Sequence, residues 1–353
     1  MSSPPKEEIL RSLRAQIDKV LVPLIQGHER HICLIDPPNH ANVGDSAILL
    51  GELAFLKARF PRSRISFFDL DSYSERCESL IDRASIILIH GGGNFGDIWP
   101  RHQELRLRLL QRFADKRIIQ LPQSISFADP AAQARTAEAI ARHGDFHLLA
   151  RDRVSHAFAT ANFACQTWLS PDMAFWLDLS AKLPTHDVFC LLRSDKEAVA
   201  DHRAIVEAVR DRADSFEVLD WMDEPNTLTR RIDRRLLWQT HRRPKITWPL
   251  MPAMLAVRRR YAQDRVEAGI DLLSRGRVVV TDRLHAHIMC CLLGIPHLVF
   301  DSLDGKVSAL FQTWSHTFES ASLIAGPDQF HAALDPIRNR DAPSAARGEF
   351  RCP

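Results

Sequence analysis

Short apolar runs alternate along this chain with longer stretches of helical periodicity. The first half contains five such runs, HICLID (31–36), RISFFDL (64–70), SIILIH (85–90), RIIQL (117–121) and FHLLA (146–150). Runs of this length with polar or turn-forming flanks are typical of buried strands. Several intervals between them are long enough for a crossover helix, so the pattern predicts a largely parallel sheet.

A second series of apolar runs follows a polar, proline-containing break near 180–187. It comprises VFCLLR (188–193), FEVLD (216–220), RVVVT (277–281) and HLVFD (297–301). Two such series predict an α/β protein with two Rossmann-like domains facing a cleft. Ligands of these sheets bind outside the carboxyl ends of the strands, so the residues that follow each strand are the candidates for function.

The length of the chain fits this division. A chain of 353 residues with 45% hydrophobic composition can bury two cores of domain size. We expect an N-terminal domain over residues 1–182, a C-terminal domain over 183–336 and a polar, frayed tail over 337–353. The first 25 residues have the spacing of an amphipathic helix and lack the basic start and continuous apolar core of a signal peptide.

Composition narrows the classes of function. The 46 Lys and Arg residues nearly balance the 44 Asp and Glu residues, which argues against nucleic acid as a partner. The seven cysteines show no spacing typical of a metal site, so we expect reduced core residues and no metal. Since no apolar stretch reaches the about 18 residues that span a bilayer, the sequence favours a cytoplasmic protein.

The segment after the first strand, DPPNHANVGDSAILLGELAFL, combines a turn with a helix. Pro37 and Pro38 end the strand, and Asp45 or Ser46 could cap the helix that follows. Asp45 also has a functional interpretation, in which its carboxylate lies in the cleft within reach of a sugar hydroxyl. Asn42, on the same turn, is a second candidate for binding such a hydroxyl.

The segment after the third strand, HGGGNFGD, is rich in glycine. Gly91, Gly93 and Gly96 match G-x-G-x-x-G, but a dinucleotide site opens its helix within the glycines, and here the helix is expected to begin only at Pro100. We therefore favour no nicotinamide cofactor. A glycine triplet still lets the backbone approach a ligand, unless it forms only a tight turn. The candidate acceptor-binding residues here are Gly92, Gly93, Asn94, Asp97 and His102.

TDRLHAHIM, at the end of a buried strand, has the features of an anion site. Asp282 is expected to cap the next helix and to place Arg283 and His285 in its first turn, where free N–H groups and the helix dipole favour anions. A guanidinium there can form bidentate hydrogen bonds with a carboxylate or phosphate, and an imidazole can transfer a proton. His287 would point to the opposite side and is expected to be structural. Arg193 ends the first strand of the second domain and is a further candidate.

Several of these segments, in this order, resemble the polysaccharide pyruvyltransferase family, in particular its bacterial exopolysaccharide and capsule branch. They are NVGDSAILLGE, HGGGNFGD, LSPDMAF, LLRSD and TDRLHAHIMCCLLGIPHLVFD, followed by Lys306, and the similarity covers roughly residues 30–315. The resemblance implies a GT-B-like architecture and transfer of the enolpyruvyl unit of phosphoenolpyruvate to a sugar as a cyclic ketal. It implies a donor site at Arg193, Arg283, Leu284 and His285.

The residues suit this chemistry in their own right. Phosphoenolpyruvate carries a carboxylate and a phosphate, which Arg193 and Arg283 can bind. Its methylene carbon must be protonated, and His285 is the candidate general acid. The sugar hydroxyls need a base in the facing domain, for which Asp45 is a better candidate than Asp97. The scheme needs no metal and no cofactor besides phosphoenolpyruvate as co-substrate.

Two other functions remain open at this point. A GT-B glycosyltransferase that uses a nucleotide sugar would share the fold, and Arg193 could bind the diphosphate. We find, however, no acidic residue in the second domain that is placed to bind the ribose. A non-catalytic subunit of carbohydrate assembly would leave the arginine and histidine of TDRLHAHIM without a purpose.

Residues 230–265 form a basic segment with eleven Lys and Arg against two acidic residues, a net charge of +9. Its apolar residues include Trp238, Trp248, Leu250, Met251, Met254 and Leu255, and its charges include Arg258, Arg259 and Arg260. Such a mixture is typical of a peripheral contact with an anionic membrane, although an exposed helix pair that covers the second domain is an equal alternative. The membrane interpretation places the protein at the inner face of the cytoplasmic membrane, with a lipid-linked oligosaccharide as acceptor.

Overall fold

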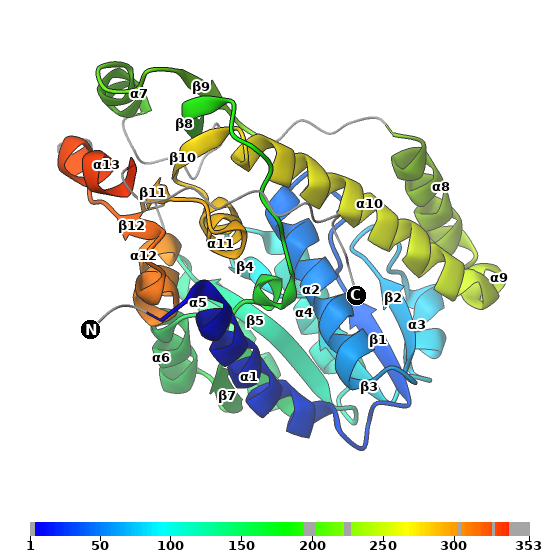
Figure 1. The fold of residues 1–353 in the computed structure, drawn as a ribbon. Coiled ribbons are helices and arrows are strands. Elements are labelled where there is room, and N and C mark those ends of the chain that lie inside the picture. Colours follow the sequence, from blue (N-terminus) through cyan, green and yellow to red (C-terminus); the bar gives the residue numbers. More distant parts are fainter. Residues whose placement is uncertain (1–3, 194–201, 222–226, 302–304, 327–328, 339–353) are drawn as a thin grey trace.

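The fold is described from a computed structural model of the chain. The structure describes residues 4–193, 202–221, 227–301, 305–326 and 329–338. Two parallel β-sheets with flanking helices form its two halves, and the chain passes from one sheet to the other between Leu169 and His186 (Figure 1).

The first sheet belongs to the N-terminal half, and its strand pairs are parallel. Its order is β2-β1-β3-β5-β6-β7, with β4 alongside β5. The winding of the chain reverses between β1 and β3, as in doubly wound sheets. The strands are β1 (His31–Ile35), β2 (Arg64–Phe68), β3 (Ile86–Ile89), β4 (Gly92–Gly96), β5 (Ile118–Ser126), β6 (Phe146–Ala150) and β7 (Gln166–Leu169).

The second sheet has the order β12-β11-β10-β8-β9, again with parallel pairs. This order repeats the topology of the first sheet, with the reversal of winding between β8 and β10. The predicted α/β fold with two Rossmann-like domains is confirmed. The strands are β8 (His186–Leu191), β9 (Phe216–Leu219), β10 (Gly276–Thr281), β11 (His297–Val299) and β12 (Ala321–Leu323).

All nine strands predicted from apolar runs are present, with ends that differ by a few residues. The structure adds β4, β7 and β12, which have weak apolar signals. β12 contains three residues, β7 is partly exposed along its length, and β4 is made from the glycine-rich segment that was predicted as a turn. In β4, Phe95 is buried and pairs with Ile125 of β5. The burial of this aromatic side chain explains why the glycine-rich segment forms a strand.

The helices of the first half connect its strands. The predicted amphipathic helix is present as α1, and Pro100 is the first residue of α4, as expected from its fixed φ angle. The helices are α1 (Lys6–Ile25), α2 (Val43–Arg59), α3 (Glu75–Ile81), α4 (Pro100–Arg112), α5 (Pro130–Ala141), α6 (Arg153–Asn162) and the 3₁₀ turn η1 (Met173–Trp176).

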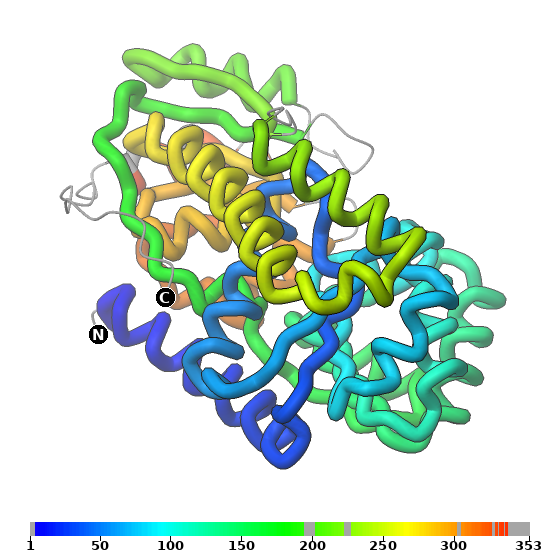
Figure 2. Tube along the Cα trace, turned by 90° about the vertical axis from the view of Figure 1, so that its right-hand side faces the viewer, coloured from blue at the N-terminus to red at the C-terminus, as the bar shows by residue number. Residues whose placement is uncertain are grey.

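The helices of the second half include a long hairpin, α8 and α10, that reaches across to the first sheet (Figure 2). Helix α13 (Phe330–Arg338) crosses the start of the tail predicted at 337, and the remaining residues of that tail, 339–353, lie outside the described residues. The helices are α7 (His202–Arg210), α8 (Leu228–Arg242), α9 (Pro244–Thr247), η2 (Trp248–Leu250), α10 (Met251–Leu273), α11 (Leu284–Leu293), α12 (Lys306–Thr313), η3 (Ser315–Thr317) and α13.

The larger hydrophobic core spans both halves of the protein. It joins α2 and the first sheet to α10, α11 and one face of the second sheet. A smaller cluster lies on the other face of the second sheet, beneath α7 and α13, and includes Val188, Ile205 and Phe330. The six described cysteines are free and five of them are buried, as expected of core residues in reduced form.

Helix α2 approaches the second half so closely that two glycines are required. A β-carbon at Gly269 of α10 would collide with Val43, and one at Gly44 would overlap the ring of His285. Both glycines lie inside helices, where glycine is otherwise unfavourable. Their presence is therefore explained by the close packing of α2 against α10 and α11.

Arg258 of α10 is buried, which corrects its assignment to an exposed basic surface. It is fully shielded from solvent and donates to Asp69 (2.7 Å), to Asp233 (3.0 Å) and to the carbonyl of Pro38 (2.6 Å). The three contacts tie α10 to α8, to the end of β2 and to the loop after β1. Burial raises the pKa of Asp233, and Arg258 opposes this shift.

We predict that Arg258→Met destabilises the protein by about 3–5 kcal/mol, because Asp69 would remain buried without a cation and Asp233 would keep only Arg230, at 3.7 Å. Arg260→Met is the matched control, since Arg260 is exposed and pairs with Asp264 along the same helix. An exposed pair of this kind contributes at most about 1 kcal/mol. Urea unfolding gives the free energy of unfolding of each variant. An equal decrease in Arg258→Met and Arg260→Met would contradict the structural role of Arg258.

Candidate functional site

A cleft of about 570 Å³ lies between the two halves. The residues that line it come mainly from segments that follow strands at the two reversals of winding. These segments come after β1 and β3 in the first sheet, and after β8 and β10 in the second. The position agrees with the general rule that doubly wound sheets bind ligands at such points. The predicted residues that line the cleft are Asn42, Asp45, Gly93, Asn94, His102, Arg193, Arg283, Leu284 and His285.

Asp45 lies in the first turn of α2 with its carboxylate on the cleft. The predicted cap is wrong, because Asn42 caps the helix by accepting from the N–H of Gly44 at 3.0 Å. His40 Nε2 lies 3.6 Å from the Asp45 carboxylate. Burial alone would raise the pKa of Asp45, but His40 and three further cationic or titratable groups around the cleft outweigh it, and the pKa is lowered. Asp45 is therefore a carboxylate at neutral pH.

Asp97 and Gly92 do not line the cleft. The Asp97 carboxylate instead accepts from the backbone N–H groups of Ala128 and Asp129, at the loop that precedes α5. Asp97 therefore orders this loop, and its position removes it as a rival to Asp45 for the role of base.

Asn94 and His102 meet at Asp36, the residue that follows β1. Asp36 is buried, has a positive φ of 65°, and accepts from His102 Nδ1 at 2.6 Å and from the Asn94 amide at 3.4 Å. The amide oxygen of Asn94 in turn accepts from Arg106 at 2.9 Å and from Gln123 at 3.0 Å. Residues that were predicted as separate candidates thus form one ordered polar wall.

Arg283 lines the opposite wall of the cleft, at the start of α11. Its Nε and one terminal nitrogen donate to the two carboxylate oxygens of Asp220, each at 2.7 Å, and its guanidinium lies near the ring of Trp221. This bidentate pair fixes the plane of the guanidinium. Asp282 is not the predicted helix cap. Its carboxylate accepts from the N–H of Arg193 at 2.9 Å and from His202 at 2.8 Å.

His285 lies where the two halves meet. Its Nε2 is 3.5 Å from Asp172 and 3.5 Å from Arg151, two residues of the first half that form a fully buried ion pair of 2.9 Å. Burial would raise the pKa of Asp172, but His285 and Arg151 outweigh it, and the pKa is lowered well below its usual range. The other side of the ring packs on Gly44, so the imidazole is held in one orientation.

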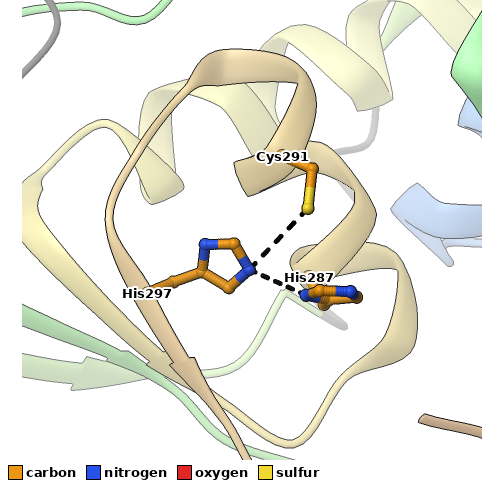
Figure 3. Close-up of side chains that lie close together, drawn as sticks. All are labelled: His287, Cys291 and His297. Carbon is orange, nitrogen blue, oxygen red and sulfur yellow. Dashed lines mark hydrogen bonds between the residues drawn. The ribbon is translucent and has the colours of Figure 1, made fainter. Parts of the chain in front are cut away.

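His287 of α11 is buried, as predicted for a structural residue, and lies beside His297 and Cys291 (Figure 3). Ser315 Oγ lies 2.6 Å from His287 Nε2, His287 Nδ1 lies 2.7 Å from His297 Nε2, and His297 Nδ1 lies 2.8 Å from the carbonyl of Ile295. Because a carbonyl only accepts, His297 carries a proton on Nδ1, and with both rings neutral His287 Nδ1 donates to His297 Nε2. Burial lowers the pKa of both histidines.

These two histidines and Cys291 form the one cluster with metal-ligand spacing in the part of the chain that the structure describes. The hydrogen bonds use both nitrogens of each imidazole, and burial holds the pKa of the Cys291 thiol far above neutrality. A metal would have to displace these bonds and deprotonate the thiol. We interpret the cluster as a core network that fixes α11, which carries Arg283 and His285 at its start.

Besides Asn39 and His40 on the loop after β1, the sequence interpretation missed four polar residues that line or border the cleft. Each stands at the carboxyl end of a strand or directly after it, and this position was the available signal. They are Asp36 after β1, His90 after β3, Arg151 after β6 and Asp220 after β9.

Known proteins resemble this chain over most of its length. The sequence profile described as polysaccharide pyruvyl transferase matches residues 42–304. The chain is 32% identical to pyruvyl transferase 1 of Schizosaccharomyces pombe, over 84% of this chain and 73% of the relative. It is also 32% identical to the putative pyruvyl transferase EpsO of Bacillus subtilis, over 84% and 89%.

Among solved structures, an uncharacterized protein from Klebsiella pneumoniae aligns with a TM-score of 0.56 and 18% identity, over 89% of this chain and 99% of that protein. At this identity the likeness concerns the fold alone. The profile match includes the residues of both cleft walls from Asn42 to His285. The chain therefore belongs to the polysaccharide pyruvyl transferase family.

Proposed function

We propose that the protein transfers the pyruvyl unit of phosphoenolpyruvate to two hydroxyls of a sugar, forming a cyclic ketal and releasing phosphate. One observation carries the proposal. Cationic residues of the second half, Arg193, Arg283 and Lys306, face the carboxylates of Asp36 and Asp45 across a single cleft. Such an arrangement suits an anionic donor on one wall and a hydroxylated acceptor on the other.

The donor would bind at the start of α11. Its phosphate and carboxylate need cationic partners, and Arg193 and Arg283 are the candidates, with Lys306 beside them. Asp220 holds the Arg283 guanidinium in place before the donor arrives, so less orientational freedom is lost on binding. The backbone N–H groups at the start of the helix add a favourable field for an anion.

His285 would supply the proton to the methylene carbon. This protonation makes the adjacent carbon electrophilic, so that a sugar hydroxyl can add to it. Asp172 and Arg151 each lie 3.5 Å from Nε2 and restrict the orientation of the ring. Over the whole reaction two hydroxyls each release one proton, the methylene carbon gains one proton, and the departing phosphate gains the other. Asp45 is the proposed base for one hydroxyl.

A nucleotide-sugar glycosyltransferase is less well supported. The second half contains an acidic residue at a strand end, Asp220, which is the candidate there for binding a ribose. Its two carboxylate oxygens are bound by Arg283, so it is not arranged to accept from a ribose.

The direct test of the proposed function is mass spectrometry of candidate sugar acceptors after incubation with the protein and phosphoenolpyruvate. We expect a product with the added mass of a pyruvate ketal, and one phosphate released per ketal. Nucleotide sugars supplied in place of phosphoenolpyruvate should give no product. Glycosyl transfer without ketal formation would contradict the proposal.

We predict that Arg283→Ala weakens the binding of phosphoenolpyruvate by about 2–4 kcal/mol, or about 30- to 900-fold, because a charge-assisted contact is lost. Part of this loss would come from Asp220, which would face the donor unpaired, so the double variant Arg283→Ala, Asp220→Asn should recover some affinity. His285→Ala should abolish turnover and largely preserve binding. Calorimetry and the ketal assay give the two readouts.

The control for these variants is Arg203→Ala, because Arg203 is exposed on α7 and pairs along its own helix with Glu207. It should match the wild type in both readouts. Near-normal turnover in His285→Ala with intact binding would remove His285 from the role of acid. Unchanged affinity in Arg283→Ala would remove Arg283 from the donor site.

We also propose that the protein docks on an anionic membrane, and that a lipid-linked sugar is the acceptor. Much of the predicted basic segment is unsuitable, because Arg258, Arg265, Trp248, Met251 and Met254 are buried. A smaller membrane patch is left around α9. Its basic members are Arg242, Arg243 and Lys245, and its exposed apolar members are Trp238, Ile246 and Leu250.

Charge and shape support this membrane patch. Arg242 lies over the ring of Trp238 at 4.4 Å, and its neighbours line a shallow groove of about 450 Å³ beside α3. Basic residues next to exposed tryptophan suit the surface of a membrane with anionic lipids. No helix among the described residues is long and apolar enough to cross a bilayer. Docking would therefore be peripheral.

We predict salt-sensitive co-sedimentation with vesicles containing anionic lipids, because about 1 kcal/mol of attraction is expected per basic residue near the surface. The variant Arg242→Ser, Arg243→Ser, Lys245→Ser should sediment much less. A control variant with three exposed arginines from other faces changed to serine (Arg11, Arg62 and Arg135) should sediment like the wild type. Equal loss in both variants would mean that net charge, and not this patch, governs binding.

A further inference from the structure

His90 is a buried histidine that follows β3 and lines the cleft beside the proposed acceptor wall. Its side chain is 3% exposed, and its Nδ1 lies 2.9 Å from Glu52 Oε2. Glu52, on α2, is 1% exposed, and its second oxygen accepts from the N–H of Gly91 at 2.9 Å. Since an ionised carboxylate only accepts, the neutral imidazole carries its proton on Nδ1 and its lone pair on Nε2.

Nε2 of His90 has no hydrogen-bond partner among the described residues, although the atom is buried. Buried polar atoms in folded proteins are nearly always paired, so an exception on the wall of a binding cleft requires an explanation. His102, on the same wall, has its Nδ1 bound to Asp36 and is more exposed. The arrangement of His90 and Glu52 is that of a carboxylate that orients a histidine base.

We infer that His90, oriented by Glu52, accepts the proton of one acceptor hydroxyl through Nε2. The inference deepens the proposed function and rests on it. Ketal formation requires two hydroxyl deprotonations, and Asp45 accounts for only one. As the O–H bond breaks, the hydroxyl oxygen bonds to the central carbon of the donor, and the proton forms a new N–H bond at Nε2. The central carbon gives up its π bond to the protonated methylene carbon in the first addition, and its C–O bond to the departing phosphate in the second. The imidazolium later releases this proton to solvent as the product leaves.

The charges around His90 favour this role. Glu52 and Asp45 on α2, and Asp36 after β1, all face the imidazole and stabilise its protonated form. Burial opposes them, and the net effect raises the pKa of His90. Asp45, in contrast, has a lowered pKa and is the weaker base of the two. A base of raised pKa removes a hydroxyl proton more readily.

The test uses His90→Gln and Glu52→Gln in the ketal assay, with phosphoenolpyruvate affinity and melting temperature as further readouts. We expect His90→Gln to lower turnover at least 100-fold, with donor affinity within about threefold of the wild type. Glu52→Gln should lower turnover less, because the histidine remains.

The pH profile separates a base from a structural residue. Turnover requires neutral His90, so it rises as pH increases through the pKa of this residue. Removing the Glu52 charge lowers that pKa, and the acidic limb of the profile should therefore move to lower pH in Glu52→Gln. The inference would be overturned if the acidic limb of Glu52→Gln stayed at the pH of the wild type, or if His90→Gln kept near-normal turnover. If His90→Gln fails to fold, the position of the acidic limb in the pH profile of Glu52→Gln tests the role of His90 by itself.

His147 provides a matched control. Its Nε2 lies 2.9 Å from Asp145 and its Nδ1 is buried without a partner among the described residues, but it lies away from the cleft. His147→Gln should keep wild-type turnover and pH profile, and an equal loss there would also contradict the inference. A wild-type protein that forms no ketal would refute the proposed function itself, which is a distinct outcome.

Discussion

The cleft depends on the close approach of α2 to the second half of the chain. At Gly44 the helix lies directly against the ring of His285, and at Gly269 α10 comes equally close to Val43. The same helix carries Asp45, so its placement brings this carboxylate of the first half close to the histidine of the second. Any residue larger than glycine at position 44 would separate the two walls, because the contact involves the body of the imidazole and not a flexible end.

The cleft is also ordered by carboxylates that hold its arginines and one of its histidines. Asp220 fixes Arg283, Asp172 fixes Arg151 beside His285, and Glu52 fixes His90. Each pair neutralises charge in a partly buried site and restricts the orientation of a group proposed to contact a ligand. The energy needed to bury such charges is offset within each pair, so the site can be built before substrate binds.

Much of this arrangement follows from the sequence, and its failures have physical causes. Apolar runs predicted nine strands, because parallel strands are buried on both faces and need continuous apolar residues. β4 was missed because Gly92 and Gly93 lack the side chains that mark a strand. The segment at 281–289 was correctly identified as part of the site, whereas Asp220 and Arg151 were overlooked because their partners are distant in sequence.

The basic segment shows a different limit. A count of charges cannot distinguish Arg258, which is buried between two aspartates, from Arg242, which is exposed. Their difference depends on the packing of α10 against the first sheet, which no local pattern encodes. The same holds for Asp97, which serves the backbone of a neighbouring loop and not the cleft.

The central claim is that the cleft binds an anionic three-carbon donor on the wall formed by the second half. A crystal structure of the complex with phosphoenolpyruvate tests it most directly. We expect the phosphate and carboxylate to contact Arg193 and Arg283, with the methylene carbon beside His285 and the open side of the cleft facing Asp45 and His90. Donor density in the groove beside Arg242, or on the wall that carries Asp36, would contradict it.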